Sequence, residues 1–130
     1  MFEKYMICES GFHNVSESGQ MTGFQICVRI GYYRGMPLSS LEDYAVTVDG
    51  QRIPREDIRF SVGGRIFTLQ ELETTTDFRW QFGEIATVTM KKPGGLTPGM
   101  HDLEVTQQLR IPYTETRDIA TARKEMTLVS

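Results

Sequence analysis

The sequence of 130 residues is poor in the side chains that most often carry catalysis or hold metals. Its only cysteines are Cys8 and Cys27, and its only histidines are His13 and His101. It contains no Cys-x-x-Cys or His-x-x-x-His pair, no glycine-rich phosphate loop opening a helix, and no Gly-x-Ser-x-Gly elbow. These gaps disfavour an enzyme that works alone. We therefore expect no metal or other cofactor in this chain, and two buried or half-buried thiols.

Charge and hydropathy exclude further classes of protein. The net charge is −3 and the pI about 5.4, which gives no electrostatic footprint for nucleic acid or an anionic membrane. No apolar run approaches the roughly 20 residues of a membrane span, and the first residues lack the features of a signal peptide. With 39% hydrophobic and 24% charged residues, the composition is that of a globular protein. We expect one cytoplasmic domain over residues 1–130.

Alternating hydrophobic and polar residues predict an all-β fold. A period of two is typical of half-buried strands, and two-residue turn signals at Asp49-Gly50 and Gly63-Gly64 predict tight hairpins. Seven or eight short strands of this kind favour an antiparallel β-sandwich with immunoglobulin-like or jelly-roll-like connectivity. The clearest predicted strands are Phe24–Ile30, Tyr44–Val48, Ile58–Val62, Arg65–Thr68, Ile85–Lys91 and Leu103–Ile111.

Helical signals are confined to two short segments. Thr68 and Glu71 have the spacing of a capping box, which predicts one or two helical turns from Leu69 to Thr74. The segment Ile119–Lys124 has a weaker pattern, compatible with a short helix or with an ordered tail. We expect residues 114–130 to form a C-terminal tail.

The segment Arg29–Leu38 is the strongest candidate for contact with a partner. Its glycines and Pro37 predict a loop, and loops rarely bury their side chains inside the domain. Aromatic residues, methionine and arginine are enriched in protein interfaces. The candidate contact residues of this loop are Tyr32, Tyr33, Arg34 and Met36.

Two further residues are weaker candidates. Trp80 alternates with polar residues and shares its face with Phe78 and Phe82, which favours an aromatic core face and leaves open a ridge against a partner. His13 lies in a predicted early loop and is more often a plain surface histidine than a contact residue.

The same segments resemble the β subunit of the bacterial C-glycoside deglycosidases. The resemblance covers about residues 1–113 in order and is a pattern of the whole domain, without a catalytic signature. The segments that carry it are Met1–Phe12, Gly23–Gln25, Val28–Ser39, Val46–Gly50, Ile53–Phe60, Val62–Gly64, Trp80–Gly83 and Lys92–Gly99.

This resemblance implies a two-component enzyme. In that family, a larger α subunit similar to the TIM barrels of sugar isomerases holds a divalent metal, usually manganese, and the catalytic residues. The implied substrate is a C-glycoside of a flavonoid or related aromatic, already oxidised to the 3-keto sugar by a separate oxidoreductase. The ketone acidifies the proton at C2, so that an enolate can form and expel the aglycone. The β subunit is implied to be a β-sandwich that docks on the barrel in a hetero-oligomer.

A hypothesis of another class stays open beside this one. The chain could be a stand-alone β-sandwich that binds carbohydrate or protein, with Tyr32, Tyr33 and Trp80 as an aromatic platform for sugar rings. The two hypotheses differ in whether the chain needs a barrel subunit.

Overall fold

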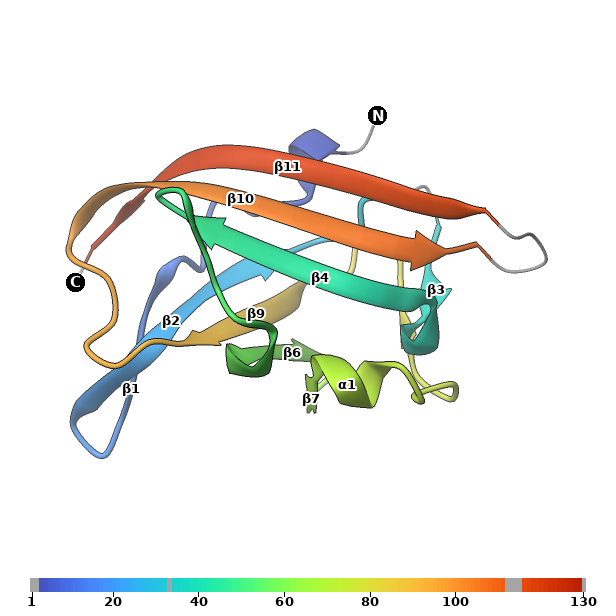
Figure 1. Cartoon of the computed structure of the whole chain (residues 1–130), viewed down its shortest axis with the longest axis horizontal. Helices are drawn as coiled ribbons and strands as arrows, with labels where there is room; N and C mark the ends of the chain where they lie inside the picture. Colours follow the sequence, from blue (N-terminus) through green and yellow to red (C-terminus); the bar gives the residue numbers. More distant parts are fainter. Residues whose placement is uncertain (1–2, 33, 112–115, 130) are drawn as a thin grey trace.

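The computed structural model describes residues 3–32, 34–111 and 116–129, and its strands form two facing antiparallel sheets (Figure 1). The first sheet has the order β1-β2-β9-β6-β7, and the second has the order β11-β10-β4-β5. A small third sheet pairs β3 with β8. The fold is thus the sandwich-like, all-β architecture that the alternation predicts.

The described residues contain eleven strands and four short helical segments. The first sheet is built from β1 (His13–Glu17), β2 (Gln20–Val28), β9 (Ala86–Lys91), β6 (Ile58–Val62) and β7 (Arg65–Thr68). The second is built from β11 (Arg117–Leu128), β10 (Gly99–Arg110), β4 (Leu41–Val48) and β5 (Gln51–Arg52). The remaining elements are β3 (Met36–Pro37), β8 (Arg79–Trp80), α1 (Leu69–Leu72), η1 (Glu3–Tyr5), η2 (Leu38–Ser40) and η3 (Arg55–Asp57).

One hydrophobic core fills the space between the two main sheets. Along most of β2, β4, β6, β9 and β10, buried residues alternate with less buried ones, as a pleated strand with one face inward requires. Three rings bridge the layers: the Phe60 centroid lies 5.7 Å from that of Tyr44 and 5.1 Å from that of Trp80. Such aromatic contacts add to the hydrophobic stabilisation of the core.

Both predicted hairpin turns are confirmed. Asp49 and Gly50 have φ angles of 50° and 83°, and Gly63 and Gly64 have 60° and 84°. Two successive residues with positive φ define the type I′ turn, whose twist suits antiparallel strands. These turns fix the register of β4 with β5 and of β6 with β7.

The predicted capping box is also confirmed. The Glu71 N–H donates to Thr68 Oγ1 at 3.1 Å, and the Thr68 N–H donates to Glu71 Oε1 at 2.8 Å. The helix α1 ends at Leu72, two residues before the predicted end. Thr75 Oγ1 donates to the Glu71 carbonyl at 2.7 Å, and this side-chain hydrogen bond satisfies a backbone carbonyl at the end of the helix.

The helical alternative for Ile119–Lys124 is wrong, because these residues belong to β11. This strand pairs with β10 over its whole length, from Gly99 opposite Leu128 to Arg110 opposite Arg117. Its alanines have a high intrinsic helix propensity, but Ala120 is buried against the core, and strand pairing overrides local preference. The C-terminal segment expected as a tail therefore contributes an edge strand of the second sheet.

The N-terminal segment runs beside β2 and is tied to it by backbone bonds. The Cys8 N–H donates to the Cys27 carbonyl at 2.9 Å, and the Arg29 N–H donates to the Met6 carbonyl at 2.8 Å. Met6, Ile7 and Cys8 are buried. Within the described ranges, no helix has the length and apolar character needed to cross a membrane.

Candidate functional site

The loop Arg29–Leu38 and the segment 79–85 form one structural unit. In the small third sheet Met36 pairs with Trp80, and the Arg79 guanidinium donates to the Gly35 carbonyl at 3.1 Å. Trp80 Nε1 donates to the Glu84 carbonyl at 2.9 Å, which closes the turn that follows β8. Two segments separated by about 45 residues in sequence are thus held side by side.

Within this unit, the candidate residues divide between the core and the surface. Met36 and Trp80 are only 2% and 1% exposed, so both are core residues of this chain and neither side chain lies on its surface. Tyr32 is half-buried and packs against the core, and Arg34 is exposed. Tyr33 lies outside the described residues. Fewer side chains of the loop are therefore exposed for contact with a partner than the sequence suggests.

His13 does not belong to this unit. It opens β1 opposite Gln25, so that it lies in a strand and not in the expected loop. Its ring is exposed, and its Nδ1 atom lies 3.0 Å from the carbonyl oxygen of Asn14. The structure gives His13 the position of a plain surface histidine.

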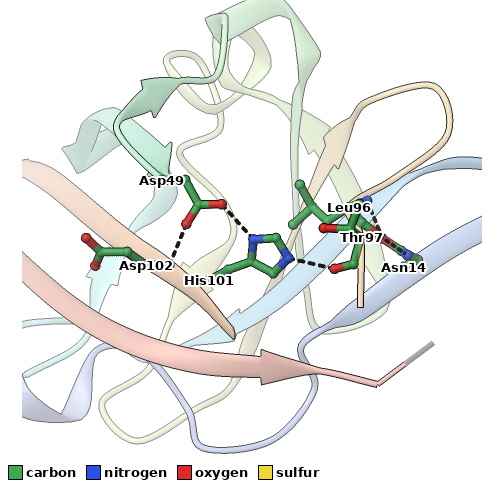
Figure 2. A network of polar contacts seen from close by, with 6 residues as sticks. All are labelled: Asn14, Asp49, Leu96, Thr97, His101 and Asp102. Carbon is green, nitrogen blue, oxygen red and sulfur yellow. Dashed lines mark hydrogen bonds and ion pairs between the residues drawn. The ribbon is translucent and has the colours of Figure 1, made fainter. Parts of the chain in front are cut away.

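The other histidine, His101, forms a buried polar network that the sequence analysis missed (Figure 2). His101 is 7% exposed; its Nδ1 lies 2.6 Å from Asp49 Oδ2, and its Nε2 lies 2.7 Å from the Thr97 carbonyl oxygen. Asp49 also accepts from the Asp102 N–H at 2.8 Å. The network joins the β4–β5 turn, β10 and the loop before β10.

A second clamp holds the same loop from the other side. Asn14 Nδ2 donates to the Leu96 carbonyl at 2.9 Å, and the Leu96 N–H donates to Asn14 Oδ1 at 2.9 Å (Figure 2). The loop between β9 and β10 is thus bonded to strands of both main sheets.

The geometry of His101 suits a structural clamp and not a general base. Both ring nitrogens lie within hydrogen-bond distance of oxygen atoms, an arrangement that favours the doubly protonated ring, and neither nitrogen is free to abstract a proton. The bond to the Thr97 carbonyl, and then the bond to Asp49, raise the pKa of His101. The Asp102 N–H, followed by His101, lowers the pKa of the Asp49 carboxyl.

The signal for His101 in the sequence was weak. It lies in phase with the buried Leu103 and Val105 along β10, which places it on the inner face. Its partner Asp49 is 52 residues away, and no local spacing indicates that pair. Among the residues that the structure describes, no group of three or more His, Cys, Asp or Glu side chains is placed to hold a metal ion.

A comparison with known protein families identifies the family of this chain. The sequence profile described as "C-glycoside deglycosidase beta subunit" matches residues 2–113. The chain belongs to this family. The matched range includes the loop Arg29–Leu38, the segment 79–85 and the His101 network, and it ends before β11.

Relatives of the family agree with this assignment. A C-glycoside deglycosidase beta subunit of Eubacterium cellulosolvens is 38% identical over 78% of this chain and 70% of its own length. A 3'-dehydrocarminate deglycosidase beta subunit of a Microbacterium species is 36% identical, over 71% of this chain and 69% of its own. A C-glycoside deglycosidase beta subunit of Arthrobacter globiformis is 31% identical, over 72% and 71%.

Proposed function

We propose that this chain is the accessory subunit of a two-component lyase that cleaves the carbon–carbon bond between the sugar and the aromatic aglycone of C-glycosides. The single observation that carries the proposal is membership of the C-glycoside deglycosidase beta subunit family. The partner in this proposal is a TIM-barrel α subunit, which holds the catalytic residues, and the complex works in the cytoplasm.

The proposed substrate is a C-glycoside whose sugar carries a ketone at C3, with a flavonoid or related aglycone. The Microbacterium relative's name specifies a 3'-dehydro substrate, which supports an oxidised sugar. A divalent metal of the α subunit, manganese in this proposal, would polarise the ketone. A base removes the C2 proton, the electron pair forms the C1–C2 double bond, and the aryl carbon leaves C1 and takes up a proton.

The described side chains of this chain support an accessory role. His101 has both ring nitrogens engaged, and burial raises the pKa of the Cys8 thiol, which weakens it as a nucleophile. His13 is exposed on an edge strand. In our proposal, proton transfer therefore takes place on the partner, and this subunit acts by supporting the partner's active-site region.

The stand-alone carbohydrate-binding alternative is less favoured. It needs an aromatic platform of Tyr32, Tyr33 and Trp80, but the Trp80 ring is 1% exposed and lies against Phe60. A stacking platform requires an accessible ring face, which Trp80 does not offer. Tyr32 is itself partly buried and packs against the core.

Co-expression tests the proposal. The chain and a candidate isomerase-like barrel protein are produced together, with a tag on the barrel, and separated by size-exclusion chromatography with light scattering. We expect a single hetero-oligomer. A monodisperse monomer that leaves the barrel unbound and instead binds underivatised glycans would favour the stand-alone module.

A further inference from the structure

A basic recess opens where the N-terminal segment meets β2 and the turn after β8. Its volume is about 350 Å³, and Tyr5 and Ile85 line it together. Both residues are large and apolar, yet they are 53% and 51% exposed. Phe82, in the adjoining turn, is 55% exposed. Exposed aromatic and aliphatic side chains gathered at one place are typical of a protein interface.

The charge of this recess is opposite to that of the whole chain. Lys4, Arg29 and Lys124 line it together with Glu9, so three cations and one carboxylate leave a surplus of two positive charges. The chain as a whole has a net charge of −3. A local surplus of cations in an acidic protein favours an occupant that carries carboxylates.

The recess continues directly into the candidate loop. Arg29 both lines the recess and begins the loop Arg29–Leu38, while Ile85 ends the segment that is bonded to this loop through Arg79 and Gly35. The apolar residues and the loop lie within the matched residues 2–113. Being a subunit is what the members of this family share by name, so most of the surface that meets the partner should lie within this range. Of the residues that line the recess, only Lys124, on β11, lies outside it.

We propose that the basic recess is the docking surface for the larger subunit, which inserts an apolar segment flanked by carboxylates between Tyr5, Ile85 and the surrounding cations. This inference rests on the proposed function, because the proposed function supplies the larger subunit as the docking partner. It moves the centre of the interface from the buried Met36 and Trp80 to the exposed Tyr5, Phe82 and Ile85. The recess cations orient the partner, and the apolar side chains supply most of the affinity.

The test uses a matched pair of double variants in the complex with the barrel protein. Tyr5→Ala with Ile85→Ala removes the apolar residues of the recess. Met100→Ala with Ile119→Ala removes two residues that are each 64% exposed on the outer face of the second sheet. All four are well exposed, so both variants should keep the melting temperature of the wild type. We expect at least about tenfold weaker association for the first variant and no change for the second.

A native thiol gives an independent readout. Cys27 lines the recess and is half-buried, whereas Cys8 beside it is only 4% exposed. Iodoacetamide should label Cys27 in the free subunit at least about tenfold faster than in the complex, because the docked partner closes the recess. Labelling is followed by mass spectrometry.

The outcomes separate the inference from the proposed function. If the wild-type chain binds the barrel and the Tyr5→Ala, Ile85→Ala variant binds equally well, with Cys27 labelled equally fast in the complex, the recess is not the docking surface and the proposed function stands. If the wild-type chain itself fails to bind the barrel, the proposed function fails and the inference falls with it.

Discussion

Replacing His101 with alanine should destabilise the domain by about 3 kcal/mol near pH 5.5. The substitution removes two charge-assisted hydrogen bonds, at 2.6 Å to Asp49 and 2.7 Å to the Thr97 carbonyl, and each such bond contributes about 1.5–3 kcal/mol. The lower value applies because the Asp49 side chain is 50% exposed and water can replace its partner. The edge-to-face contact with Phe12, at 6.1 Å and 87°, is lost as well.

The expected shift in melting temperature follows from the length of the chain. Unfolding entropy is about 2.1 cal/mol/K per residue, or about 270 cal/mol/K for 130 residues. A loss of about 3 kcal/mol therefore lowers the midpoint by about 11 °C. Thermal melts followed by circular dichroism measure it. His13→Ala is the matched control, since this exposed histidine should change the stability by no more than about 0.5 kcal/mol.

The pH dependence tests the charge state of His101. Its pKa is raised in the folded protein, so its contribution is complete below the unfolded value of about 6.5 and is lost as the pH rises through the folded pKa. The pKa of Asp49 is lowered, so its contribution is complete above about 3.9 and is lost as the pH falls through its folded pKa. The difference in the free energy of unfolding between the wild type and the His101→Ala variant should thus be largest from about pH 4 to 6.5 and smaller at pH 9. A difference that is equal at pH 5.5 and pH 9 would refute a doubly protonated His101.

Other substitutions test separate parts of the structure. Thr68→Ala removes the cap of α1 and should cost about 1 kcal/mol in urea unfolding; no loss would show that the capping box does not stabilise the domain. Trp80→Ala should cost about 3–5 kcal/mol, because its ring is buried between the sheets, whereas a near-neutral result would contradict its core position. Gly23→Ala should cost about 1–3 kcal/mol, since its Cβ would overlap the Met90 carbonyl; a stable variant would argue against this close approach. Replacing Tyr32 and Tyr33 together with alanine should weaken assembly with the barrel by about 2 kcal/mol in titration calorimetry, and unchanged affinity would remove the loop from the interface.

Much of the fold was predictable because it depends on local patterns. The alternation of buried and polar residues identifies β2, β4, β6, β9 and β10, and the Asp49-Gly50 and Gly63-Gly64 turns fix two hairpins. The capping box is likewise a local signal. The strand β11 was not predicted, because its buried side chains include small alanines. Its strand conformation depends on pairing with β10, which the local sequence does not show.

The candidate site was less predictable because its members come together only in the folded chain. Met36 looked like a surface residue from its loop, but the pairing of β3 with β8 buries it against Trp80. The His101–Asp49 pair and the basic recess each join residues from distant segments. Nothing in the local sequence around Tyr5 or Ile85 shows that their side chains share one recess.

Turnover by the separate and combined subunits tests the central claim most directly. Purified chain, purified barrel protein and their mixture are each incubated with a 3-keto C-glycoside, and release of the aglycone is followed by chromatography. The account predicts release by the mixture at least about a hundredfold faster than by either protein alone, because the catalytic groups and their support lie on different chains. Equal release by the barrel without this chain, or any release by this chain alone, would contradict it.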